Sequence, residues 1–175
     1  MVLLKIVNII AVAKMREGFD LEVLNEKLEN TEINSSGNWL KMRLKPEDHY
    51  IAFYKSGKFL TTGLKKFEDV EEVTNRVIVK LKDVGIQNPL EKVEIVNIVL
   101  TEHVEFDGSL EDVLFSLDSS NASYEPEQFP GLFYKDVDGL SYTLFQSGKM
   151  IVTGVKDLDL AKKNVEKLKN TLKAL

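Results

Sequence analysis

Two asparagines are the clearest candidates for directional chemistry in this sequence, because they recur in matching surroundings. The segment KIVNII at 5–10 returns as EIVNIV at 94–99, so Asn8 has a counterpart in Asn97. A side-chain amide both donates and accepts hydrogen bonds. From the residues alone, the simplest interpretation is that each amide bonds to neighbouring backbone within its strand.

A second pair of segments carries hydroxyl groups in the same repeated way. AFYKSGKFLTTGLK at 52–65 returns as TLFQSGKMIVTGVK at 143–156, which matches Thr62 with Thr153. The offset between the two copies is close to 90 residues, too long for a solenoid repeat. The sequence therefore predicts a duplicated domain with pseudo-two-fold symmetry.

Patterns typical of enzymes and metal sites are missing from the sequence. It contains no GxxxxGK[ST], HExxH or GxSxG motif and no cysteine. The acids in 102–112 lack the spacing of a calcium loop, and His49 and His103 lie apart with no acid and nucleophile beside them. We expect a protein that is not an enzyme, with no cofactor, no metal and no small-molecule substrate.

Charge and hydropathy narrow the choice of partners. The net charge is −5, from 14 basic and 13 acidic residues in 1–90 and 9 basic and 15 acidic residues in 91–175. Because nucleic-acid binders are usually basic, this total argues mildly against such a role. No apolar run reaches the roughly 18–20 residues of a membrane span. The apolar start, 1–14, is interpreted as a strand, so no membrane partner is expected.

Each half of the chain predicts the element order β-α-β-β-β-α. The short helices are expected at 20–30 and 109–118, where Asp20 and Ser109 are N-cap residues. The long helices are expected at 68–84 and 157–174. The strands are expected at 3–13, 38–45, 49–55 and 58–63 in the first copy, and at 92–103, 131–136, 140–145 and 149–154 in the second.

These elements predict an α+β fold built from two repeats, 1–90 and 91–175, packed as one intertwined body. Together they would give an antiparallel sheet of about ten strands with helices on one face. The alternation within strands then puts Leu60 with Thr62, and Ile151 with Thr153, on the face without helices. Such an apolar face marks an interaction site. The residues alone do not decide whether this face binds a ligand or is covered by a second protein chain.

The quoted repeats resemble the TATA-binding protein family. YEPEQFPGLFYK at 124–135, together with LFQSGKMIVTGVK and EIVNIV, is similar to the second repeat of its archaeal branch. The resemblance covers nearly the whole chain. It implies a saddle-shaped fold with the helices on the convex face. It also implies an archaeal cell interior as the location, in association with the nucleoid.

The resemblance further implies that the concave face lies in the minor groove of double-stranded A·T-rich DNA and bends it. Amide and hydroxyl donors suit the adenine N3 and thymine O2 acceptors found there. Further lysines, Lys65, Lys135 and Lys156, resemble phosphate-contacting positions. The DNA-binding residues implied in this way are Asn8, Ile10, Tyr54, Lys58, Leu60, Thr62, Asn97, Val99, Phe129, Phe145, Lys149, Ile151 and Thr153.

The family inserts a pair of phenylalanine wedges from each repeat, and here the two repeats differ. The second repeat has both, as Phe129 and Phe145. Counting back from the SGK motif matches Phe145 with Tyr54 and Phe129 with Asn38, and Trp39 is one place further on. Either Trp39 substitutes as a wedge after a one-residue shift, or the first repeat has lost its ability to kink DNA.

The loop before Phe129 resembles the site at which the family meets transcription factor B. Its candidate partner-binding residues are Glu125, Glu127 and Gln128. The first function expected is therefore a general transcription factor that binds promoter DNA and recruits transcription factor B. The alternative is a divergent paralogue that acts mainly as a protein-interaction module with weak or altered DNA binding. A domain that binds RNA or RNA–DNA hybrids is a third, weaker hypothesis.

Overall fold

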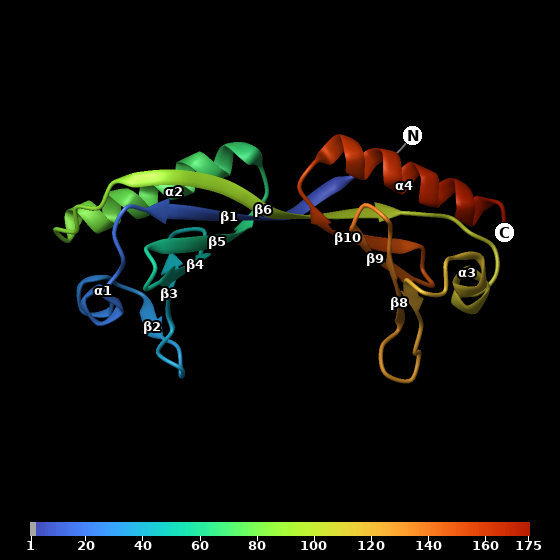
Figure 1. Ribbon diagram of the computed structural model, residues 1–175, viewed down its shortest axis with the longest axis horizontal. Helices are drawn as coiled ribbons and strands as arrows, with labels where there is room; N and C mark the ends of the chain where they lie inside the picture. The colour runs from blue at the N-terminus through green and yellow to red at the C-terminus, as the bar shows by residue number, and fades with distance from the viewer. Residues whose placement is uncertain (1–2) are drawn as a thin grey trace. The chain divides into compact units, whose positions relative to one another are not determined.

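The structure is a computed structural model that describes residues 3–175. Ten strands form one open antiparallel sheet in the order β2-β3-β4-β5-β1-β6-β10-β9-β8-β7, accompanied by four helices (Figure 1). The chain divides into two compact units. Residues 8–96 are called the repeat-one unit, and residues 3–7 with 97–175 the repeat-two unit.

Equivalent elements occur in the same order in the two repeats. The first repeat contains β1 (Lys5–Met15), α1 (Leu21–Lys27), β2 (Thr31–Ile33), β3 (Trp39–Leu44), β4 (His49–Tyr54), β5 (Lys58–Leu64) and α2 (Phe67–Asp83). The second contains β6 (Leu90–His103), α3 (Leu110–Ser116), β7 (Ala122–Ser123), β8 (Gly131–Lys135), β9 (Ser141–Phe145), β10 (Lys149–Val155) and α4 (Leu158–Lys173).

The predicted helices and their caps are confirmed. The Asp20 side chain accepts hydrogen bonds from the backbone N–H groups of Glu22 and Val23. Ser109 is the N-cap of α3, and it forms a reciprocal capping box with Asp112. These bonds satisfy N–H groups that the first turn of a helix leaves without partners.

Each repeat contains one strand more than predicted, so the order is β-α-β-β-β-β-α. The extra strands, β2 and β7, have only three and two residues. They pair with β3 and β8 at the two ends of the strand order. Segments this short show no alternation of apolar and polar residues, so no sequence signal indicated them.

One face of each unit's sheet is covered by a long helix. In the repeat-one unit, α2 buries Val70, Val73, Val77 and Leu81, which lie on one face of the helix. In the repeat-two unit, α4 lies over the strands in the same way (Figure 1). Among the described residues, no helix covers the opposite face of either unit. Within residues 3–175, no helix has the length and apolar character needed to cross a membrane.

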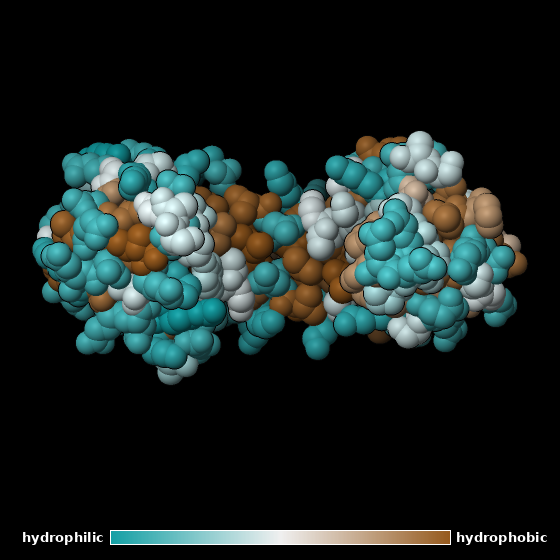
Figure 2. All heavy atoms as spheres, turned by 90° about the horizontal axis from the view of Figure 1, so that it is seen from below, coloured by the Kyte–Doolittle hydropathy of each residue, from teal (hydrophilic) through white to brown (hydrophobic). Residues whose placement is uncertain are grey.

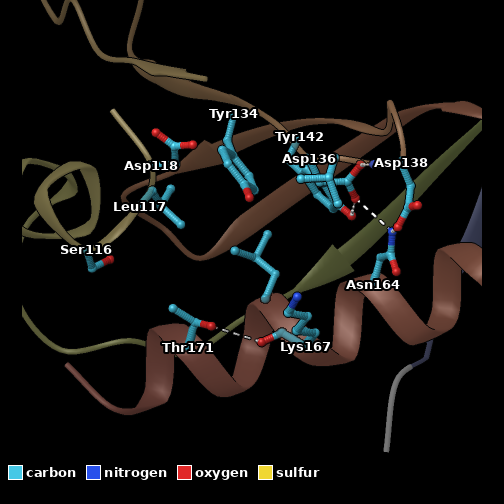
Figure 3. Close-up of a pocket in the computed structure, with 12 residues that line it drawn as sticks. Ser116, Leu117, Asp118, Tyr134, Asp136, Asp138, Tyr142, Asn164, Lys167 and Thr171 are labelled. Carbon is cyan, nitrogen blue, oxygen red and sulfur yellow. Dashed lines mark hydrogen bonds between the residues drawn. The ribbon is translucent and has the colours of Figure 1, made fainter. Parts of the chain in front are cut away.

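The hairpin between β8 and β9 is joined to α4 by a cluster of partly buried polar side chains (Figure 3). The Tyr142 hydroxyl donates to Oδ2 of Asp136 at 2.7 Å, and Nδ2 of Asn164 on α4 donates to the same oxygen at 2.9 Å. Burial and the bond to Asp136 raise the pKa of Tyr142. This cluster fixes β9 so that its alternate residues, Ser141 and Thr143, face the side without helices.

A second polar contact between the sheet and α4 involves Glu102 on β6. Its carboxylate accepts hydrogen bonds from the backbone N–H groups of His103 and Leu3, both at 2.8 Å, and lies 3.5 Å from Nζ of Lys169 on α4. Burial raises the pKa of Glu102, but these bonds and Lys169 outweigh burial, so the pKa is lowered overall. The carboxylate therefore contributes stability in its charged form.

We predict that Glu102→Gln destabilises the protein by about 1–3 kcal/mol, because a neutral amide replaces a charged acceptor and leaves Lys169 unpaired. Since the folded-state pKa lies below the unfolded one, the advantage of the wild type is present above the unfolded pKa. It is lost as the pH falls through the folded pKa. Urea unfolding of the wild type and of Glu102→Gln at several pH values measures this difference in stability. Glu166→Gln on the exposed side of α4 is the matched control, and an equal loss in both variants contradicts the prediction.

Candidate nucleic-acid interface

In the repeat-one unit, one face of the sheet is not covered by a helix. Most side chains on this face are half-buried, and those on the inner strands are mainly uncharged. Strand register places Leu60 on β5 between Val12 of β1 and Ala52 of β4, and Thr62 opposite Tyr50. We call this surface the repeat-one open face. It consists of Asn8, Ile10, Val12, Lys14, Trp39, Lys41, Arg43, Tyr50, Ala52, Tyr54, Lys58, Leu60 and Thr62.

The repeat-two unit has an equivalent surface, the repeat-two open face. Ile151 on β10 lies between Thr101 of β6 and Thr143 of β9, and Thr153 lies opposite Ser141. Figure 2 views the side away from α2 and α4 and shows apolar surface on each unit. This face consists of Asn97, Val99, Thr101, His103, Gly131, Phe133, Lys135, Ser141, Thr143, Phe145, Lys149, Ile151 and Thr153, together with the ring of Phe129.

Asn8 and Asn97 are held by the same hydrogen bond in the two units. Oδ1 of Asn8 accepts from the backbone N–H of Gly63 at 2.8 Å, and Oδ1 of Asn97 accepts from that of Gly154 at 2.9 Å. A backbone N–H only donates, so the oxygen of each amide must face it. Each side chain therefore bonds to neighbouring backbone, as the simplest interpretation held. Within residues 3–175, no hydrogen bond engages its NH₂ group, which leaves both protons to donate.

Glycine is required at the partner positions. Gly63 and Gly154 have φ of 84° and 77°, a left-handed conformation that other residues rarely adopt. Both lie beside irregularities in the ladder, where the β1–β5 and β10–β6 registers shift. A bulge of this kind frees one N–H from the ladder. The freed N–H is the one that holds the asparagine.

Three aromatic rings form a cluster at the outer end of the repeat-two open face. Phe129 stacks on Phe133 with ring centroids 5.0 Å apart and lies 5.9 Å from Phe145. Its side chain is 38% exposed. Gly131 makes room for it, because a Cβ there would lie 2.6 Å from Cε1 of Phe129. Phe133 was not predicted as a site residue, although its alternation with Gly131 and Lys135 along the strand could have indicated it.

The loop that leads into Phe129 is tightly turned and exposed. The carbonyl oxygen of Glu125 accepts from the N–H groups of Gln128 at 2.9 Å and Phe129 at 3.0 Å. Glu125, Glu127 and Gln128 are all exposed. The loop therefore presents two carboxylates and an amide on one turn, immediately before the ring cluster in the chain.

Cations on the open faces are unequally divided between the units. Lys58 and Lys149 start β5 and β10, and both are exposed. The repeat-one face adds three cations that were not predicted as site residues, namely Lys14 on β1, whose Nζ donates to the carbonyl oxygen of Ser56, and Lys41 and Arg43 on β3. Lys41 forms an ion pair with Glu32 at 2.5 Å, and the Arg43 guanidinium lies 5.1 Å from the centroid of the Tyr50 ring. Their alternation with buried Leu40 and Met42 is the signal that would have found them.

Comparison with known proteins decides the family. A family model described as "Transcription factor TFIID (or TATA-binding protein, TBP)" matches residues 3–84 and 92–175. The chain belongs to the TATA-binding protein family. It is 34% identical to the TATA-box-binding protein of Methanocaldococcus jannaschii, covering 97% of this chain and 93% of the relative. Against that of Archaeoglobus fulgidus it is 33% identical, covering 98% and 96%.

The fold comparison agrees with the sequence. The solved structure of Methanococcus jannaschii TBP matches with a TM-score of 0.84 at 33% identity, covering 98% of this chain and 99% of that one. The predicted α+β fold of the TATA-binding protein family is therefore confirmed. The family is one of transcription factors. The roles of individual site residues stay predictions.

Strand register adds one match between the two repeats of this TATA-binding protein. Trp39 pairs with Tyr54, and Gly131 pairs with Phe145, so Trp39 occupies the place of Gly131. In the preceding loop, the backbone bond from Gly37 to Asn34 repeats the bond from Gln128 to Glu125, so Asn38 stays the counterpart of Phe129. The second repeat therefore has one residue more, Pro130, between this turn and the strand.

The match of Trp39 with Gly131 shows how the first repeat differs in construction. Its ring projects from the strand itself, where Trp39 packs edge-on against Tyr50 with centroids 6.2 Å apart. In the second repeat the strand residue is glycine and the ring arrives from the preceding loop. The side chain of Trp39 thus fills the site that a loop ring would need.

We predict that Gly131→Ala costs about 1–3 kcal/mol in unfolding free energy, because its Cβ overlaps the Phe129 ring. Most of that cost should vanish in a Phe129→Ala background, where the ring is gone. A smaller cost should persist there, because Cγ2 of Thr143 also lies 2.9 Å from the added Cβ. A double-mutant cycle by thermal unfolding measures the coupling. Additive effects would show that Phe129 does not lie over Gly131.

Proposed function

We propose that this chain is a general transcription initiation factor that binds the minor groove of A·T-rich duplex DNA with both open faces. The family assignment supports transcription as the setting. The finer proposal rests on the chemistry of the two faces. It requires donors for the groove's acceptors, an apolar floor, and cations for the phosphates.

The observation that carries the proposal is the orientation of the two asparagine amides. With Oδ1 of Asn8 and Asn97 engaged by glycine backbone, each amide presents N–H donors. The minor groove of A·T pairs presents only acceptors, adenine N3 and thymine O2. A side chain that could flip would serve donors and acceptors equally well, whereas these two are fixed as donors.

The apolar residues beside the amides add shape selection. Ile10 and Leu60 in repeat one, and Val99 and Ile151 in repeat two, are half-buried and flank the amide strands. Guanine adds an amino group to the minor groove, for which an apolar side chain offers no hydrogen-bond acceptor. The exposed Lys58 and Lys149 supply phosphate contacts, which locally offset the overall charge of −5.

The Phe129 cluster is the proposed wedge. An apolar ring inserted between base steps partly unstacks them and kinks the duplex, a general behaviour known for this family and for other minor-groove binders. Phe133 and Phe145 support the ring from below. Pro130 restricts the backbone of Phe129 and keeps the ring at the strand end.

The loop before the wedge is the proposed contact for transcription factor B. Glu125 and Glu127 are exposed on one turn, and they would meet a basic surface on that partner. The backbone bonds from Gln128 and Phe129 to Glu125 hold this turn in the unbound chain. Recruitment would therefore need little reordering of the loop.

A second candidate function is a protein-interaction module with weak DNA binding. It is favoured by Trp39, which occupies the place of Gly131 and leaves repeat one without a loop ring. A titration of an A·T-rich duplex by fluorescence anisotropy, with and without transcription factor B, separates the two. Binding by the chain alone below about 1 µM, tighter than non-specific binding, excludes the module. Absence of binding at tens of micromolar, on the order of the non-specific range, excludes the transcription factor.

We predict that Asn97→Asp weakens binding to that duplex by at least about 1–3 kcal/mol, because a carboxylate replaces the donor and faces groove acceptors. Asn170→Asp on the exposed side of α4 adds the same charge away from the open face and is the control. Anisotropy titrations of both variants at one salt concentration give the comparison. Equal weakening would mean that charge alone is responsible and that Asn97 reads no base.

We predict that Phe129→Ala removes most of the DNA bend while retaining part of the affinity, because the amides and lysines remain. Energy transfer between dyes at the two duplex ends reports the bend. Tyr54→Ala and Trp39→Ala are the companion variants. A loss of bend in either would show that repeat one also inserts a ring, and an unchanged bend in Phe129→Ala would remove the wedge from repeat two.

A further inference from the structure

The two open faces differ in hydroxyl content around one equivalent residue. Leu60 in repeat one lies between Val12 and Ala52. Ile151 in repeat two lies between Thr101 and Thr143. Two apolar neighbours in one unit are therefore replaced by two hydroxyl-bearing neighbours in the other.

The next position along β9 extends the difference. Ser141 lies opposite Thr153, whereas its counterpart Tyr50 lies opposite Thr62. The Tyr50 ring is packed against Trp39 and Arg43 and fills that part of the face. On the repeat-two face, small hydroxyl side chains and Gly131 take the places of those rings.

The repeat-two hydroxyls are available for a ligand. Thr101, Ser141 and Thr143 are half-buried, and within residues 3–175 their side chains make no hydrogen bond to another protein group. The strand that carries two of them is fixed from behind, since Tyr142 between them is bonded to Asp136. A hydroxyl both donates and accepts, so it suits an acceptor or a donor on the ligand.

We infer that the repeat-two open face accepts a G·C base pair in its half of the DNA site, through Thr101, Ser141 and Thr143, whereas the repeat-one face requires A·T. Guanine differs from adenine in the minor groove by one amino donor. A hydroxyl oxygen can accept from that donor, and the side chains of Val12 and Ala52 have no acceptor. This inference rests on the proposed function, because it names which base pairs the same faces read.

The difference between the faces also sets the orientation of the chain on DNA. One repeat accepts a G·C pair and the other requires A·T pairs. A DNA site with a G·C pair in only one half is therefore bound in one orientation only. The repeat-two face must take the G·C half. Orientation on DNA then follows from the polar neighbours of Ile151, independently of any partner protein.

Three duplexes of equal length test the inference. One contains only alternating A·T pairs, one has a G·C pair in a single half, and one has G·C pairs in both halves. The single-half duplex should bind only about twofold more weakly than the first, since one of two orientations is lost. The duplex with both halves changed should bind roughly tenfold to a hundredfold more weakly, the usual cost of a mismatched pair.

Orientation is read by energy transfer from a single labelled cysteine. The chain contains no cysteine, so Val137→Cys, at a position 91% exposed on the β8–β9 turn, gives one labelling site in repeat two. An acceptor dye at the end of the G·C half should give the higher transfer. Equal transfer from both ends overturns the inference.

The variant that removes all three hydroxyls is Thr101→Val, Ser141→Ala and Thr143→Val together. Measured against its own affinity for the A·T duplex, it should lose both the tolerance of the G·C half and the orientation preference. Ser119→Ala with Thr171→Val, away from the open face, is the control and should behave as the wild type. Thermal unfolding of both confirms that they fold.

Failure of the proposed function and failure of this inference give different results. No binding to the A·T duplex overturns the proposed function, and this inference with it. Binding to that duplex with a tenfold or greater loss on the single-half duplex overturns the inference alone. The inference alone is also overturned if the variant lacking the hydroxyls still tolerates the G·C half. Equal binding of the wild type to all three duplexes overturns it as well, because neither face would then discriminate between base pairs.

Discussion

The hydrogen bond between a bulge glycine and a strand asparagine is the constraint on which the candidate interface depends. Gly63 and Gly154 adopt positive φ, release one N–H from the sheet ladder, and donate it to Oδ1 of Asn8 and Asn97. The bond removes the freedom of each amide to present its oxygen outward. Each sheet face thereby gains a donor of fixed direction, and the same arrangement appears in both units.

The helix-covered side of each unit makes that face available. Because α2 and α4 bury the opposite side of the sheet, the core is complete without the open faces. The residues there are free to be selected for what they contact and need not fill a core. This freedom explains why Trp39 and Gly131 can occupy equivalent places with such different side chains, while the core residues behind them, Leu40 and Leu132, stay alike.

Most of the fold could be predicted from the sequence, because duplication allowed each half to be checked against the other. The caps at Asp20 and Ser109 are local signals, and the structure confirms them. The strands β2 and β7 were missed because two or three residues carry no period. The match of Trp39 with Gly131 was missed because one additional loop residue before β8 changes neither the composition nor the alternation. Only the pairings of Trp39 with Tyr54 and of Gly131 with Phe145 reveal it.

The site was predictable to the extent that it repeats. Asn8 with Asn97 and Thr62 with Thr153 stood out because identical residues recur at one offset. The residues that distinguish the repeats carried no such signal: Thr101 against Val12, and Thr143 against Ala52, became comparable only once register placed them on either side of Ile151 and Leu60. Identity between repeats identifies what both halves must do alike. A directional function has to come from the positions where the halves differ, and sequence repetition is least informative there.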